Sequence, residues 1–151
     1  MNYYPLIASG ELTEEATKIE IKVDNNGEPF NLRAAVFAIE VIPTTTNTSD
    51  NGGFYLRVNE NSAARGNLGQ GQNMLRNDPS KPSRKMQVEI IGGLFLTLFG
   101  YNGAAGVPVS AFNVDFSSLT AIYVTGYTSG ASTMGVGTRW ALYGLREDEN
   151  G

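Results

Sequence analysis

Apolar and polar residues alternate along several short segments of this 151-residue chain, whereas the spacing of an amphipathic helix is hard to find. In KIEIKVD, residues 18–24, Ile19 and Ile21 alternate with charged side chains. Successive side chains of a β-strand point to opposite faces, so a two-residue period predicts a strand with one buried face. Segments with this period lie within residues 4–12, 18–24, 30–42, 54–58, 86–100, 118–128 and 138–144. The pattern predicts an all-β fold.

Turn residues divide these segments. The Asn26-Gly27 pair tolerates positive φ angles and predicts a tight hairpin between residues 18–24 and 30–42. Within the second of these strands the large apolar residues change from even to odd positions near Ala34-Ala35, which predicts a β-bulge.

Seven or eight short strands joined by such turns predict an antiparallel β-sandwich, and a closed barrel of the same strands is the main alternative. The length favours a single domain over residues 1–151. The predicted core consists of Ile19, Ile21, Val23, Phe37, Ile39, Val41, Leu96, Ile122, Val124, Trp140 and Leu142.

The composition narrows the possible chemistry. The chain contains no cysteine and no histidine, so it has no disulfide, no thiolate metal site and no imidazole base. Its net charge of −4 argues against a nucleic-acid partner. No apolar run approaches the roughly 18 residues of a membrane span, and the first fifteen residues lack the features of a signal peptide. We expect synthesis in the cytoplasm and no membrane insertion.

No catalytic motif is present. The stretches GYTSGAS and GNLGQG fit neither a nucleophile elbow nor a phosphate-binding loop, and we interpret both as turns. Two carboxylates suffice for glycoside hydrolysis, so a small hydrolase is one alternative. The carboxylates at 20, 24, 40 and 89, however, occupy positions that a solvent-facing side of a strand fills with polar residues. We therefore predict a non-enzymatic protein with no cofactor and no metal site.

Residues 60–85 show no period and form the predicted long irregular loop, here termed the basic segment. Five basic and two acidic residues give it a net charge of +3 in an acidic chain. We expect contact with an acidic neighbour or an anionic glycan, and a solvated surface loop is the simpler alternative. The candidate contact residues are Arg65, Arg76, Arg84 and Lys85.

The stretch LFLTLFG is apolar on both faces. Such a strand lies either between two packed layers or at a subunit interface. We predict a homo-oligomer, with a trimer favoured. The candidate interface residues are Leu94, Phe95, Leu96, Leu98 and Phe99.

The chain nearly ends with GVGTRWALYGLREDENG, and residues 136–146 fit the pattern small-Gly-Thr-x-Φ-x-Φ-Tyr-Gly-Φ-Arg, where Φ is apolar or aromatic. This pattern resembles the terminal strand of tailed-bacteriophage virion proteins, as do the preceding LTAIYV strand, the TSGAS turn and the early strand FNLRAAVFAIEVIP. The resemblance touches about half of the chain, and no fibre-like or coiled-coil flank accompanies it. A terminal strand paired inside a sheet would bury Trp140 and Leu142, and the acidic residues after it would keep the chain end solvated.

The resemblance implies a jelly-roll-like sandwich in a tail fibre, baseplate, receptor-binding part or capsid decoration, often as a trimer. It also implies other virion proteins as partners, localisation in the virion and a contribution to host attachment. The alternative function is a carbohydrate-binding module that recognises a cell-surface glycan, because tyrosine rings such as Tyr55, Tyr123 and Tyr143 stack on sugars.

Overall fold

The computed structural model describes residues 4–42, 54–59, 65–67, 84–91, 94–100, 111–113, 118–126 and 133–147. These residues form strands and loops and contain no helix, so the prediction of an all-β fold is confirmed. The strands are β1 (Leu6–Glu11), β2 (Lys18–Ile21), β3 (Leu32–Val41), β4 (Phe54–Val58), β5 (Arg65–Asn67), β6 (Arg84–Ile91), β7 (Leu94–Gly100), β8 (Ala111–Asn113), β9 (Ile122–Gly126) and β10 (Arg139–Arg146).

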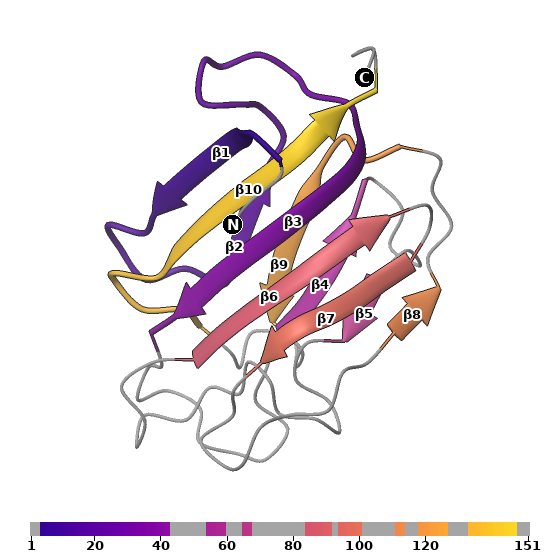
Figure 1. The fold of residues 1–151 in the computed structure, drawn as a ribbon. Helices are drawn as coiled ribbons and strands as arrows, with labels where there is room; N and C mark the ends of the chain where they lie inside the picture. The colour runs from indigo at the N-terminus through magenta and orange to yellow at the C-terminus, as the bar shows by residue number, and fades with distance from the viewer. Residues whose placement is uncertain are drawn as a thin grey trace.

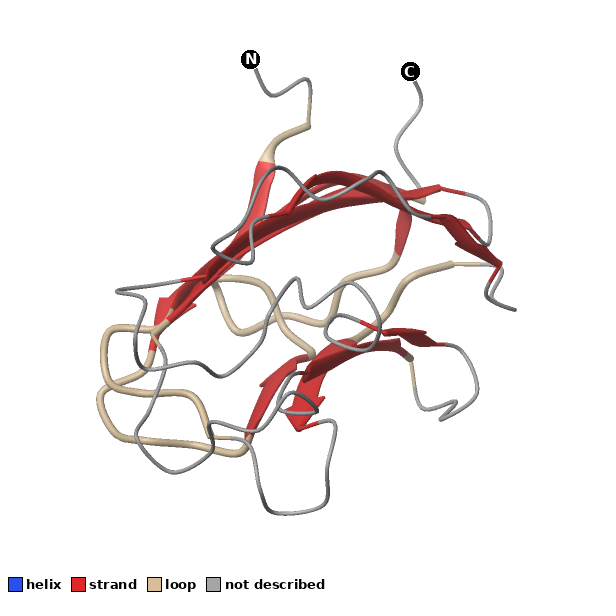
Figure 2. Cartoon of the chain, turned by 90° about the horizontal axis from the view of Figure 1, so that it is seen from below, coloured by secondary structure: helices blue, strands red, loops and turns tan. Residues whose placement is uncertain are grey.

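The strands form two antiparallel sheets. The larger sheet has the order β1-β10-β3-β6-β7-β8, and the smaller has the order β2-β9-β4-β5. The larger sheet lies in front in Figure 1, and the two sheets form two layers in Figure 2. Strands β5 and β8, each three residues long, were not predicted from the sequence.

The buried apolar cluster draws on both sheets. Ile19, Ile122 and Val124 come from the smaller sheet, and Phe37 and Leu142 come from the larger one. Most of the predicted core is therefore confirmed. Three predicted members differ: Val23 is 45% exposed, Trp140 is only partly buried, and the side chain of Leu96 lies outside the described residues.

The predicted hairpin at Asn26-Gly27 is correct as a turn and wrong as a strand pairing. Gly27 has a φ of 81° and its N–H donates to the Asp24 carbonyl at 3.0 Å. Beyond a single bridge between Val23 and Pro29, however, β2 pairs with β9, and β3 pairs with β10 and β6. The chain thus crosses from one sheet to the other at this turn, and the apolar sides of both strands contribute to the same core.

The β-bulge predicted near Ala34-Ala35 is present. Both alanines are buried, so the burial pattern changes phase between them. The register of β3 against β10 is irregular at the same place, since Leu145 pairs with Ala34 and Arg146 pairs with Leu32. The irregularity lies at the start of β3, and the pairing of the rest of β3 with β10 is regular.

The C-terminal strand β10 lies between β1 and β3 and is hydrogen-bonded to both. Leu142 is fully buried, so the predicted anchoring of the chain end inside a sheet is confirmed. Gly144 is required here, because a Cβ atom at this position would lie 2.7 Å from Cδ1 of the buried Leu32. The described residues include no helix that could span a membrane.

Candidate binding face on the six-stranded sheet

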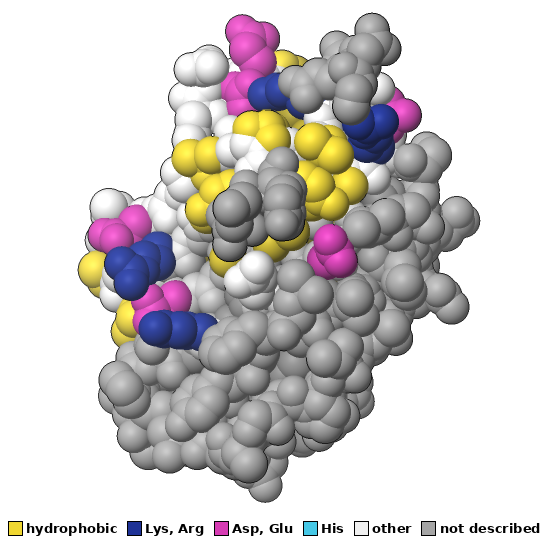
Figure 3. Space-filling view, viewed as in Figure 1, with side chains coloured by type: hydrophobic (Ala, Val, Ile, Leu, Met, Phe, Trp, Pro, Cys, Tyr) yellow, Lys and Arg dark blue, Asp and Glu magenta, His cyan; other side chains and the backbone are white. Residues whose placement is uncertain are grey.

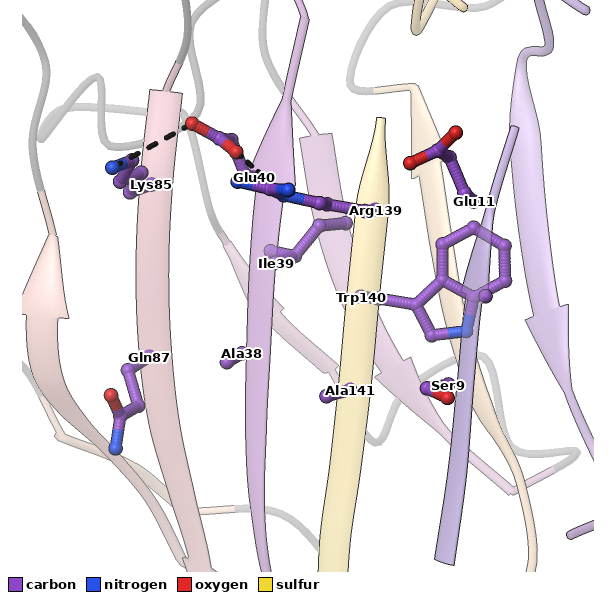
Figure 4. Close-up of a pocket in the computed structure, with 11 residues that line it drawn as sticks. Ser9, Glu11, Ala38, Ile39, Glu40, Lys85, Gln87, Arg139, Trp140 and Ala141 are labelled. Atoms are coloured by element: carbon purple, nitrogen blue, oxygen red, sulfur yellow. Dashed lines mark hydrogen bonds and ion pairs between the residues drawn. The ribbon is translucent and has the colours of Figure 1, made fainter. Parts of the chain in front are cut away.

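A row of alternating charges crosses the outer face of the six-stranded sheet, which is the face turned away from the smaller sheet. In register order from β1 to β6, this charged row consists of Glu11, Arg139, Glu40 and Lys85. Arg139 Nε lies 2.9 Å from Glu40 Oε1, and Lys85 Nζ lies 3.7 Å from Glu40 Oε2 (Figure 4). The row carries two negative and two positive charges and is therefore neutral as a whole.

Exposure differs strongly along the charged row. The side chain of Glu40 is only 18% exposed, whereas those of Arg139 and Lys85 are 65% and 59% exposed. The two cations therefore flank the carboxylate and remain accessible to a partner.

Three of the four side chains in the next row, two positions away along each strand, are small. Its members in register order are Ser9, Ala141, Ala38 and Gln87. Because Ser9, Ala141 and Ala38 have short side chains, the surface sinks into an open trough of about 700 Å³ that the charged row borders on one side (Figure 4). The trough runs across four strands.

A third row is apolar on β1, β10 and β3 and ends at Glu89 on β6. Tyr143 and Val36 are neighbours in register and partly exposed, and Leu6 on β1 is 49% exposed. Figure 3 shows hydrophobic side chains gathered over β10 and the strands beside it, with acidic and basic side chains nearby. An exposed apolar patch bordered by charges is typical of an interaction surface.

The free edge of β1 is covered by the turn that follows β2. The Ser9 N–H donates to Asn25 Oδ1 at 3.0 Å, and the Asn25 N–H donates to the Ile7 carbonyl at 3.0 Å. These bonds occupy backbone groups that another strand would need for pairing. Contact with a partner on this side of the sheet is therefore expected at the face and not at the edge.

Asp24 has a structural role. The sequence pattern placed it on a solvent-facing side, but its side chain is only 8% exposed. Its Oδ1 accepts hydrogen bonds from the N–H groups of Asn26 at 2.8 Å and Glu28 at 3.0 Å, and its Oδ2 pairs with Arg146 Nη2 at 3.0 Å. The turn is thereby fastened to the end of β10.

The same contacts set the acidity of Asp24. The hydrogen bond from the Glu28 N–H is the main cause that holds the pKa of Asp24 below its ordinary value of 3.8. Partial burial acts in the opposite direction, and the Asn26 N–H and Arg146 add to the lowering of this pKa.

The four candidate contact residues do not form one loop. Arg65 lies in β5 beside Arg57 of β4, whereas Arg84 and Lys85 begin β6 in the other sheet. The basic segment, residues 60–85, was predicted to be an irregular loop. It instead contains strand residues both within it (β5) and at its end (the start of β6). Only Lys85 among the four has a described side chain, and it pairs with Glu40. Arg76 lies outside the described residues.

The candidate interface strand lies inside the larger sheet. Leu94, Phe95 and Leu96 pair with β6 on one side and with β8 on the other, while Phe99 pairs with Gln87 of β6. This position agrees with the alternative of an inner strand. The side chains of residues 94–100, Leu98 included, lie outside the described part of the chain, so the oligomer interface at β7 stays a prediction.

The charged row was missed by the sequence analysis. Each of its members occupies a position where a half-buried strand normally carries a polar residue and therefore resembles an ordinary solvent-facing charge. Only the strand order and register bring residues 11, 40, 85 and 139 into one line.

Comparison with known proteins assigns no family. No family model matches the chain, and no curated protein matches it. A solved structure described as a functionally unknown protein from Saccharomyces cerevisiae is 12% identical and aligns over 89% of this chain and 92% of its own length, with a TM-score of 0.39. A likeness at this level identifies neither a family nor a function.

Proposed function

We propose that the chain is a non-enzymatic structural component of a phage virion, in a tail, baseplate or capsid-accessory position. In this proposal the two layers form a jelly-roll-like β-sandwich that joins copies of itself and other virion proteins, and a contribution to host attachment follows from an exposed position in the particle. The two sheets that share one apolar cluster support the sandwich architecture.

The contacts of the terminal strand motif carry the proposal. Gly137 has a φ of 93°, Thr138 Oγ1 accepts the Ile42 N–H at 3.0 Å, and Leu142 is fully buried. Gly144 makes room for Leu32, and Arg146 binds Asp24. The residues by which the chain resembles virion proteins thus stabilise the fold. A resemblance in such residues favours a common structural domain over a common enzymatic activity.

Mass spectrometry of purified particles tests this role. Particles released from a host that carries the gene are purified by density gradient, and the chain is quantified against the most abundant capsid protein. We expect the chain in particle fractions at a fixed ratio, resistant to washing with high salt. Detection only in the soluble lysate, with particles otherwise complete, would contradict the proposal.

One observation favours the second candidate, a glycan-binding module. The trough is lined by Ser9, Gln87 and the charged row, which supply hydrogen-bond donors and acceptors for sugar hydroxyls. A glycan array with the parent chain and with Ala38→Trp, which would fill the trough, tests it. Binding that the variant loses would support this candidate, and absence of binding by the parent chain would reject it.

A further inference from the structure

We propose that the outer face of the six-stranded sheet binds a second copy of the same chain, related by a two-fold axis that runs along the strands between β10 and β3. This inference rests on the proposed role as an assembling component. The expected oligomer is then built from a two-fold homodimer and not from the trimer that the sequence favoured.

The order of charges in the charged row carries this inference. A two-fold rotation about such an axis, with the two sheets face to face, places β10 opposite the partner's β3 and β1 opposite the partner's β6. Arg139 then faces Glu40 of the partner subunit, and Glu11 faces Lys85 of the partner subunit. Each charge thus has an opposite charge as its counterpart, and the Arg139–Glu40 pairs beside the axis are the closest ones.

Two orders of the same four charges would fail, namely those with like charges on the two central strands. An arrangement with both cations on the two central strands would bring like charges together under this rotation. The observed alternation from Glu11 to Lys85 is one that makes the row complementary to itself. Like charges that face each other across an interface disfavour association, so the order of the four charges favours this alignment of the two copies over alignments that bring like charges together.

Exposure and distance fit the same arrangement. Arg139 lies 2.9 Å from Glu40 of its own chain and is still 65% exposed, so it can bridge to a second carboxylate. Two such arginines and two glutamates would form a ring of alternating charges around the axis. Isolated surface ion pairs contribute little to stability, so we expect the ring to set register and not to supply most of the affinity.

Apolar contact supplies the main driving force. The same rotation places Ala141 opposite the partner's Ala38 and Tyr143 opposite the partner's Val36. Packed sheets lie roughly 10 Å apart and cross at about −30°, so pairs beside the axis stay opposed while pairs on the outer strands diverge. The exposed patch over β10 and the strands beside it would be buried (Figure 3).

Two charge-reversal variants test the arrangement by complementation. Arg139→Glu and Glu40→Arg each place like charges across the axis, so each alone is expected to sediment as a monomer where the parent chain is a dimer. Each is expected to raise the dissociation constant roughly tenfold or more. In an equal mixture, the two cationic side chains of one variant meet the two anionic side chains of the other. The mixture is therefore expected to regain the dimer, in a one-to-one ratio.

Contacts within a single chain cannot produce this result, because mixing leaves each intrachain pair unchanged. Lys18→Glu is the matched control, since Lys18 pairs with Glu20 on the smaller sheet. This variant should dimerise like the parent chain. Ala38→Lys tests the centre of the face without altering the charged row, and it should be monomeric. Melting temperatures of all variants show whether each one is folded.

Several outcomes would overturn the inference. A parent chain that remains monomeric up to about 1 mM would do so. So would a trimer that the charge reversals do not affect, or folded single variants whose mixture stays monomeric. Glycan binding by a monomeric parent chain would assign the face to a sugar instead. A dimer found by sedimentation together with absence from particles would contradict only the virion role, so the two proposals fail separately.

Discussion

The indole ring of Trp140 lies against the backbone of Gly10, its register partner on β1. A Cβ atom at Gly10 would lie 2.8 Å from ring atom Cε2 of Trp140, which is closer than packed atoms allow. An aromatic ring from an inner strand thus covers a glycine on an edge strand, an arrangement known to pin strand register. The pair ties the first strand of the chain to the last one.

Replacement of Gly10 by alanine is expected to destabilise the fold by about 1–3 kcal/mol, because the ring must leave its position. Urea unfolding of Gly10→Ala measures the loss. The same change in a Trp140→Leu background should cost clearly less, since the ring is then absent. Equal costs in both backgrounds would show that the ring does not pack on Gly10.

Truncation of Leu142 tests the burial of the terminal strand. This side chain is fully buried in the core cluster, so Leu142→Ala should lower the free energy of unfolding by roughly 2–5 kcal/mol through lost contacts and a cavity. Thermal and urea unfolding give the value. A loss below about 1 kcal/mol would show that β10 is not part of the core.

The hydroxyl of Thr138 connects the start of β10 to the end of β3. Thr138 is fully buried and its Oγ1 accepts the Ile42 N–H at 3.0 Å. Thr138→Val keeps the shape of the side chain and removes this acceptor, which should cost about 1–3 kcal/mol. Thr17→Val at an exposed position is the control and should stay within about 0.5 kcal/mol of the parent chain. Equal unfolding curves for the two variants would contradict the assigned bond.

Asp24 predicts a dependence of stability on pH. Its pKa is lower in the folded chain than its ordinary value of 3.8, so below that value the unfolded chain binds more protons. The stabilisation by the Asp24 carboxylate is therefore complete above the ordinary pKa and disappears as the pH falls through the folded-state pKa. Unfolding curves between about pH 2 and pH 6 should show a smaller acid-induced loss for Asp24→Asn than for the parent chain. Parallel curves would contradict this role.

The sequence predicted features that depend on neighbouring residues. The parity of Ile19 and Ile21 marked β2, the Asn26-Gly27 pair marked the turn, and the parity change at Ala34-Ala35 marked the bulge. Each depends on local backbone geometry, which a few adjacent residues determine.

Strand partners depend on distant residues and were not predictable in the same way. Residues of β2 pair with residues of β9 about a hundred positions later, so the short turn after β2 does not determine the sheet. Strands of three residues, such as β5 and β8, offer too few positions for an alternation to be recognised. The charged row combines four strands and appears only when their register is known.

The position of β10 between β1 and β3 is the central claim, and cross-strand proton contacts in an NMR spectrum test it most directly. The Ser9 N–H points to Asn25 and away from β10, so Ser9 and Ala141 form a pair without mutual hydrogen bonds, and Leu142 and Phe37 form the corresponding pair on the other side. Such pairs bring their α protons close together. We predict strong α-proton contacts from Ala141 to Ser9 and from Leu142 to Phe37. Absence of either contact, or α-proton contacts between residues 18–21 and 32–41, would contradict the fold described here.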